Sequence, residues 1–236
     1  MADNSAPSSD NWRDGISAAV GDDRWNSWDN EVQLAVSEFN HHLIGNAGYR
    51  PLDWRIIKAM TWVESGANSS EWKKKPMQIG VAGDPGLSAL LSAKEGGDLI
   101  LPPAWKSRLT VASVRADPLH NIRAGVGYLL MRSARFEYRS VLDGDSRTFD
   151  VTVKAGDSLE KVAKAQGSTV DVLKSLNPAA NILRSGQILK CRKASIGQVI
   201  TGWRPINSAM IANRYNGGGD SEYAKKFDYV WTIIAR

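Results

Sequence analysis

The sequence predicts a mainly helical fold in which one helical domain is interrupted by a small β-α-α-β module. Apolar residues recur at helical spacing on both sides of the module, and two short segments inside it alternate as strands do. Size agrees with this prediction, because 236 residues with 42% hydrophobic and 23% charged side chains can bury one medium core and carry a smaller module.

The helical domain is predicted to consist of two stretches of chain, residues 11–145 and 196–236. The helical pattern is expected to run to residue 139 and to resume from residue 195. Residues 1–10 precede the domain as a disordered tail, because Ser, Asp, Asn, Ala and Pro bury little apolar surface. Surface loops have ends that lie close together, so a domain of this kind tolerates an insertion between its two parts.

The clearest helices of the first stretch are expected over 53–64 and 121–136. Asp53 is expected to cap the first of them, and Gly66 is expected to end it. Both helices have an apolar face, formed in the first by Ile56, Ile57, Met60 and Val63, and in the second by Ile122, Val126, Leu129 and Leu130.

The inserted module, residues 149–193, differs from the sequence on either side of it. The expected order is a strand over 149–153, helices over 158–166 and 169–176, and a strand over 187–191. Its small core is expected to contain Val162, Val172, Leu173, Leu176, Ile188 and Leu189. Eight Lys and Arg residues against four Asp and Glu give the module most of the chain's formal charge of +5, which favours an anionic partner.

Three strings of residues mark the module: Gly156-Asp157-Ser158-Leu159 after the first strand, Leu176-Asn177-Pro178 after the second helix, and Gly186-Gln187 before the last strand. With these strings the module resembles a LysM domain, a family that binds glycans containing N-acetylglucosamine. The resemblance implies that sugar lies between the first strand–helix loop and the second helix–strand loop, at Gly156, Asp157, Ser158, Asn181, Ile182 and Leu183.

Four short motifs follow one another along the helical stretches. They are Glu64-Ser65 at the end of a helix, Met77-Gln78 in the following turn, Asn121-x-x-x-Gly125 with Gly127-Tyr128-Leu129 on a later helix, and Tyr215-Asn216-Gly217 beyond the module, with Tyr223 after it. One dipeptide recurs by chance, but four motifs in this order are specific. The helical stretches are therefore similar to soluble lytic transglycosylases and goose-type lysozymes, a family of lysozyme-like helical domains that cleave peptidoglycan.

The resemblance implies cleavage of the β-1,4 bond between N-acetylmuramic acid and N-acetylglucosamine, with Glu64 as the acid/base. The residue type suits this chemistry, because a carboxyl group behind an apolar stripe at the C-terminal end of a helix is expected to have a raised pKa. The same resemblance places substrate-binding groups at Ser65, Met77, Gln78, Tyr215, Asn216 and Tyr223.

The sequence leaves the type of reaction open. A lytic transglycosylase needs one acid/base, because the 6-hydroxyl of the substrate attacks, whereas an inverting muramidase needs a second carboxylate about 6.5–9.5 Å away to activate water. Asp84 and Asp98 are the candidates for that second carboxylate. We favour the transglycosylase, with the muramidase and a non-catalytic cell-wall-binding protein as alternatives.

No cofactor or metal is expected, because His41, His42 and His120 lack metal-ligand spacing and no phosphate-loop motif occurs. Lys and Arg are too dispersed to indicate nucleic acid, and no apolar run is long enough for membrane insertion. The expected partners are peptidoglycan glycan strands and an immunity or delivery protein. The start of the chain shows no secretory signal, so we expect action in the periplasm or cell wall after export by a secretion machine or phage, as an antibacterial effector, or after removal of a leader.

Overall fold

The computed structural model describes residues 9–144 and 147–235 of the chain. Residues 1–8 of the expected tail lie outside the described residues, whereas the last two residues of that expected tail already belong to helix α1 (Ser9–Ala18). The described chain is mainly helical, and its four strands form two separate two-stranded sheets. This agrees with the mainly helical fold predicted from the sequence.

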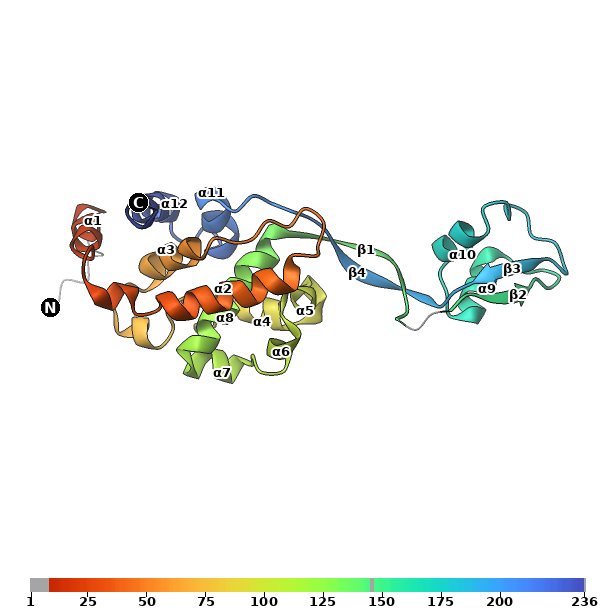
Figure 1. Ribbon diagram of the computed structural model, residues 1–236, viewed down its shortest axis with the longest axis horizontal. Helices are drawn as coiled ribbons and strands as arrows, with labels where there is room; N and C mark the ends of the chain where they lie inside the picture. The colour runs from red at the N-terminus through yellow and green to blue at the C-terminus, as the bar shows by residue number, and fades with distance from the viewer. Residues whose placement is uncertain (1–8, 145–146, 236) are drawn as a thin grey trace. The chain divides into compact units, whose positions relative to one another are not determined.

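Two compact units divide the chain (Figure 1). Unit 1 comprises the residues up to Arg135 and those from Ile200 onward, and unit 2 is Phe136–Val199. The chain therefore leaves unit 1 once and returns to it once, so that two distant stretches of sequence build unit 1 together.

Unit 1 is built from helices. After α1 they are α2 (Asp29–Leu43), α3 (Trp54–Glu64), α4 (Gly86–Leu91), α5 (Gly97–Ile100), α6 (Pro103–Lys106), α7 (Val111–Ala116), α8 (Pro118–Ser133), α11 (Ser208–Met210) and α12 (Tyr223–Ile234), with 3-10 turns at Asp23–Asn26, Ser70–Lys73 and Ala93–Glu95. Helix α8 is buried along most of its length and packs against α2, α4, α5 and α7. Helix α3 packs against α2 from the first stretch and against α12 from the last, so both stretches share one core.

Helix α3 begins and ends where the sequence predicts. The Asp53 carboxylate accepts the backbone N–H of Arg55 at 3.0 Å and so caps the first turn. Gly66 follows the helix with a φ of 67°, a conformation that favours glycine, and its N–H donates to the Thr61 carbonyl. This termination makes Glu64 the last residue of the helix.

An aromatic cluster supports the end of α3 that carries Glu64. The rings of Trp25 and Trp62 pack edge to face with centroids 4.9 Å apart, and Trp72 lies 5.9 Å from Trp25. All three rings are buried. A Cβ at Gly66 would lie 2.9 Å from the Trp25 ring, so the chain after the helix passes close to this cluster.

Unit 2 contains the predicted β-α-α-β module, formed by β2 (Phe149–Thr152), α9 (Leu159–Gln166), α10 (Val170–Leu176) and β3 (Ile188–Cys191). Strands β2 and β3 pair antiparallel, with Phe149 opposite Cys191. The buried core of the module consists of Val153, Val162, Ala163, Leu173, Ala180, Leu189 and Cys191. The prediction of Ile188 as a core residue is wrong: its side chain is 62% exposed, because neighbours in a strand face opposite sides and Leu189 takes the inward position.

Strands β1 (Ala134–Leu142) and β4 (Ala194–Trp203) pair with each other, and neither was predicted from the sequence. The prediction of helix is wrong at residues 134–139, because α8 ends at Ser133 and β1 follows, and at residues 195–203, which belong to β4; helices resume with α11. Aromatic and charged side chains alternate after Ser133, which favours a strand, but no Gly or Pro separates them from the preceding helical pattern.

Candidate active site

Glu64 is a partly buried residue at the C-terminal end of α3. Tyr223, the first residue of α12, is buried and donates its phenolic O–H to Glu64 Oε1 at 2.7 Å. Because α12 packs against α3, two residues that are far apart in the sequence form this pair. Tyr223, predicted as a substrate-binding residue, therefore contacts the proposed acid itself.

Burial raises the pKa of Glu64 from 4.5 to about 7. The negative charges of Asp220 and Asp84 raise this pKa as well, whereas the hydrogen bond from Tyr223 lowers it. A carboxyl group with a pKa near 7 can both hold and release a proton at neutral pH, which an acid/base catalyst requires. The direction of the shift agrees with the prediction from the sequence.

The loop Met77-Gln78-Ile79 is held in place by one buried side chain of α8. Asn121 Oδ1 accepts the backbone N–H of Met77 at 2.9 Å, and Asn121 Nδ2 donates to the carbonyl of Ile79 at 2.9 Å. Between these two residues Gln78 has a φ of 51°, which is uncommon for a residue other than glycine. Asn121 thus fixes the backbone on both sides of this strained position.

Tyr215 ends a π-helical turn, Ile211–Tyr215, that continues directly from α11. Its phenolic O–H donates to the carbonyl of Met77 at 2.9 Å, and its ring lies 5.4 Å from the ring of Tyr128. Burial raises the pKa of Tyr215 well above its usual value, so the O–H remains a donor at neutral pH. Short π-helical turns are rare and occur often at functional sites.

A cavity of about 260 Å³ lies at the Glu64 carboxyl group. Each of the four sequence motifs contributes to its lining, which consists of Glu64, Met77, Gln78, Ile79, Val81, Asp84, Tyr128, Tyr215 and Asn216. Ser65 and Tyr223, the other two predicted substrate-binding residues, do not line it. Ser65 Oγ donates to the carbonyl of Pro76 at 3.0 Å, so this side chain ties the end of α3 to the start of the Met77 loop.

The two candidates for a second carboxylate lie in different places. Asp84 lines the cavity, and its oxygens accept the backbone N–H groups of Gly80 at 2.9 Å and Gly86 at 2.7 Å. Asp98 is exposed on α5, where Ile100 takes the buried position, and it does not line the cavity. The structure therefore brings Asp84 to the site and leaves Asp98 outside it.

Two further residues of the site were not predicted from the sequence. Tyr128 lines the cavity and follows Asn121 by seven residues, a spacing that places both on one helix face and could have identified it. Asp220 raises the pKa of Glu64, and its backbone N–H donates to Asn216 Oδ1 at 2.9 Å. No periodicity predicts where a loop carboxylate such as Asp220 will lie.

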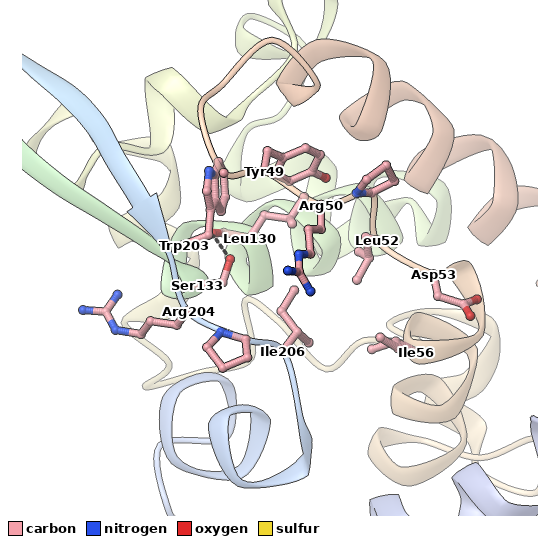
Figure 2. Close-up of a pocket in the computed structure, with 13 residues that line it drawn as sticks. Tyr49, Arg50, Leu52, Asp53, Ile56, Leu130, Ser133, Trp203, Arg204 and Ile206 are labelled. Carbon is pink, nitrogen blue, oxygen red and sulfur yellow. Dashed lines mark hydrogen bonds between the residues drawn. The ribbon is translucent and has the colours of Figure 1, made fainter.

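A second and larger cavity of about 560 Å³ also lies in unit 1 (Figure 2). Tyr49 and Trp203 line one part of it and pack edge to face at 4.7 Å, while Arg204 points away from the other labelled side chains. Its acidic lining residue is Asp53, whose pKa is lowered by hydrogen bonds from Arg55. This cavity therefore offers no acid suited to protonating a glycosidic oxygen.

The first predicted sugar-binding loop of unit 2 is shaped by its own hydrogen bonds. Ser158 Oγ accepts the backbone N–H of Lys161 at 3.2 Å and caps α9. Asp157 Oδ2 accepts the backbone N–H of Lys154 at 2.7 Å, and Gly156 between these residues has a φ of 81°. Gly156 is exposed, whereas Asp157 and Ser158 are partly buried.

Residues 151–192 match the LysM domain family. The matched segment begins within β2 and ends one residue beyond β3, so it spans nearly the whole β-α-α-β module. The resemblance stated for this module is thereby confirmed. No curated protein and no solved structure matches the chain, and the similarity of the helical stretches to lytic transglycosylases stays a prediction.

LysM domains bind the glycan strands of peptidoglycan. In this LysM domain the second predicted contact loop presents Asn181 and Ile182 to solvent, and the Ile182 side chain is 80% exposed. Leu183 instead packs against the core of the domain and is partly buried. An exposed isoleucine beside a polar amide suits the mixed apolar and hydroxyl surface of a sugar.

Within residues 9–144 and 147–235, no group of three or more His, Cys, Asp or Glu side chains is placed to hold a metal ion. The helices of the described chain include none that is long and apolar enough to cross a membrane. Cys191, the single cysteine of the sequence, is buried in the core of the LysM domain.

Proposed function

We propose that this protein is a peptidoglycan-cleaving glycosidase that acts on the β-1,4 bond between N-acetylmuramic acid and N-acetylglucosamine. The observation that carries the proposal is the Glu64 carboxyl group, which has a pKa of about 7 and lines a cavity of about 260 Å³. Glycosidases need a carboxylic acid that is still protonated near neutral pH. The LysM match supports this choice of substrate.

The lytic transglycosylase reaction suits a site with one such acid. Glu64 donates its proton to the glycosidic oxygen, the bond between that oxygen and C1 of the muramic sugar breaks, and the N-acetylglucosamine side leaves with a free 4-hydroxyl. The Glu64 carboxylate then takes the proton of the 6-hydroxyl of the same muramic sugar, and the 6-oxygen forms a bond to C1. The new end is a 1,6-anhydro sugar, and Glu64 regains its proton.

Polar groups around the carboxyl are available for this chemistry. Tyr223 holds Oε1 of Glu64, which leaves Oε2 to meet the glycosidic oxygen. Asn216 uses its amide oxygen to accept the N–H of Asp220, and Gln78 uses its amide nitrogen to donate to a backbone carbonyl. The amide nitrogen of Asn216 and the amide oxygen of Gln78 therefore remain to bind sugar hydroxyls.

Asp84 supports a second candidate, an inverting muramidase, because it lines the same cavity as Glu64. In that reaction Asp84 would take a proton from the attacking water. However, both of its oxygens accept backbone N–H groups of the surrounding loop, which indicates that it holds the loop. We therefore favour the transglycosylase.

The LysM match by itself also supports a protein that binds the cell wall without cutting it. Release of soluble fragments from purified insoluble peptidoglycan separates this alternative from the glycosidase. We expect the wild type to release fragments, and Glu64→Gln to release them at least about 100-fold more slowly, because positioned acid/base groups contribute about that much or more. Binding of both proteins without release by either would instead support the wall-binding protein.

The proposed substrate also implies where the protein acts, since peptidoglycan lies outside the cytoplasm. We propose that it acts in the periplasm or cell wall as a delivered antibacterial effector or phage-type lysin, with a delivery protein and an immunity protein as partners. Bacteria that direct the chain to the periplasm should lyse, and those that retain it in the cytoplasm should not. Equal survival in both cases would contradict this proposal.

A further inference from the structure

Arginine side chains gather in unit 1 on segments that are far apart in the sequence. Arg132, on α8, donates Nε–H to the backbone carbonyl of Arg214 at 3.2 Å. Arg204 donates Nη1–H to the backbone carbonyl of Ala134 at 2.6 Å. The side chain of the neighbouring Arg135 passes close to Gly202, 3.9 Å from the position that a Cβ would take there. We call this group the arginine cluster: Arg132, Arg135, Arg204 and Arg214.

The arginine cluster has little negative charge to balance it. Within the described chain only Arg132 has a carboxylate partner, the exposed Glu95, with Nη1 and Oε2 3.7 Å apart. Burial and the positive charges of the other three arginines lower the pKa of Arg204. Like charges held together destabilise a fold, and a bound anion would relieve this repulsion.

Two members of the arginine cluster, Arg132 and Arg214, lie beside the Glu64 cavity. The Arg132 guanidinium lies 6.0 Å from the ring centroid of Tyr128, which lines that cavity. Arg214 directly precedes Tyr215, another lining residue, whereas Arg204 lines the larger cavity and its side chain points away from the other side chains labelled in Figure 2. An anion bound by Arg132 and Arg214 would therefore lie next to a glycan that occupies the Glu64 cavity.

We propose that the arginine cluster binds carboxylates of the peptide stems of peptidoglycan, so that the preferred substrate is a peptide-bearing strand and not bare glycan. This inference rests on the proposed function, because the strand must occupy the Glu64 cavity. Guanidinium groups stay charged and present paired donors that match a carboxylate. The peptide stem is attached to the muramic sugar, whose C1 would react at Glu64, so its carboxylates come near the cluster.

Binding of soluble glycan strands to the full chain carrying Glu64→Gln tests the proposal without cleavage. The strands are of three kinds: peptide-bearing, peptide-bearing with all carboxyl groups amidated, and peptide-free after amidase treatment. The test variant adds Arg135→Gln and Arg214→Gln, whose side chains donate no hydrogen bond within the described residues. The matched control adds Lys73→Gln and Lys74→Gln, which remove the same charge from exposed positions.

We expect Glu64→Gln to bind peptide-bearing strands about tenfold more tightly than the other two kinds, the effect of roughly 1.4 kcal/mol of charge-assisted contact. The two arginine replacements should remove this difference, and the two lysine replacements should keep it. Equal affinity for all three kinds would overturn the proposal, as would a difference that survives the arginine replacements. Peptide-free strands that bind as tightly as peptide-bearing ones would also overturn it, because the carboxylate would then belong to the sugar. If this discrimination holds but the wild type cleaves no strand, the glycosidase proposal fails and this one does not.

Discussion

Replacing Glu64 by glutamine removes a carboxyl group whose ionisation the fold opposes. The pKa of this group is 4.5 in an unfolded chain and about 7 in the folded protein, so the folded state binds the proton more tightly. Between these two values the folded state holds more protons than the unfolded state, and stability therefore falls as the pH rises. At about 1.4 kcal/mol per pH unit, ionisation costs the folded protein up to about 3 kcal/mol above pH 7 and nothing below pH 4.5.

Glu64→Gln keeps an amide oxygen that can accept the Tyr223 O–H, and it carries no charge at any pH. We expect its free energy of unfolding to equal that of the wild type at pH 4 within about 1 kcal/mol, and to exceed it by up to about 3 kcal/mol at pH 8. Urea denaturation across this pH range measures both values.

The matched control is Glu222→Gln, an exposed glutamate in a surface pair with Lys225. Its effect on unfolding should be small and nearly independent of pH. A Glu64→Gln variant that is no more stable than the wild type at pH 8 would refute the raised pKa. So would a difference between Glu64→Gln and the wild type that does not change with pH.

Three other changes have defined outcomes. Tyr223→Phe removes the hydrogen bond that lowers the pKa of Glu64, so the alkaline limb of the pH–rate profile should move to higher pH; movement to lower pH would contradict the assignment. Asn121→Ala leaves two buried backbone groups of the Met77 loop unpaired, so urea denaturation should show that the free energy of unfolding falls by about 2–4 kcal/mol. A fall below about 0.5 kcal/mol would mean that the loop does not depend on the Asn121 side chain. Ile182→Asp changes an exposed LysM side chain, so it should weaken sedimentation with insoluble peptidoglycan and leave the thermal transition unchanged; unaltered sedimentation would exclude this loop from binding.

Local patterns in the sequence predict part of this fold. The apolar stripe, the Asp53 cap and the Gly66 stop define α3 because each acts within a few residues along the chain. The same local rules predict the β-α-α-β order of the LysM domain. Strand β1 escaped prediction because Ala134 follows α8 with no Gly or Pro between them, so that its alternating side chains directly continue a helical pattern. Strand β4 contains Gly197 and Gly202, and glycines inside a strand weaken its sequence pattern.

The sequence likewise predicts only part of the candidate site. Motifs identify Glu64 and Tyr223, but only tertiary packing brings α12 to α3 and joins them. The sequence offers Asp84 and Asp98 as equal candidates, because both follow the Met77-Gln78 motif and no local pattern ranks one above the other. Backbone N–H groups hold Asp84 at the cavity, whereas Asp98 faces solvent, and no sequence pattern predicts that difference.

The most direct test of the central claim is the mass of the new sugar ends released from purified peptidoglycan. Wild-type protein should release fragments that end in 1,6-anhydro-N-acetylmuramic acid, one water lighter than a reducing end, and Glu64→Gln should release none. Reducing ends without the anhydro product would contradict the transglycosylase and direct attention to Asp84 as a base. Anhydro ends released equally by both proteins would contradict the role of Glu64.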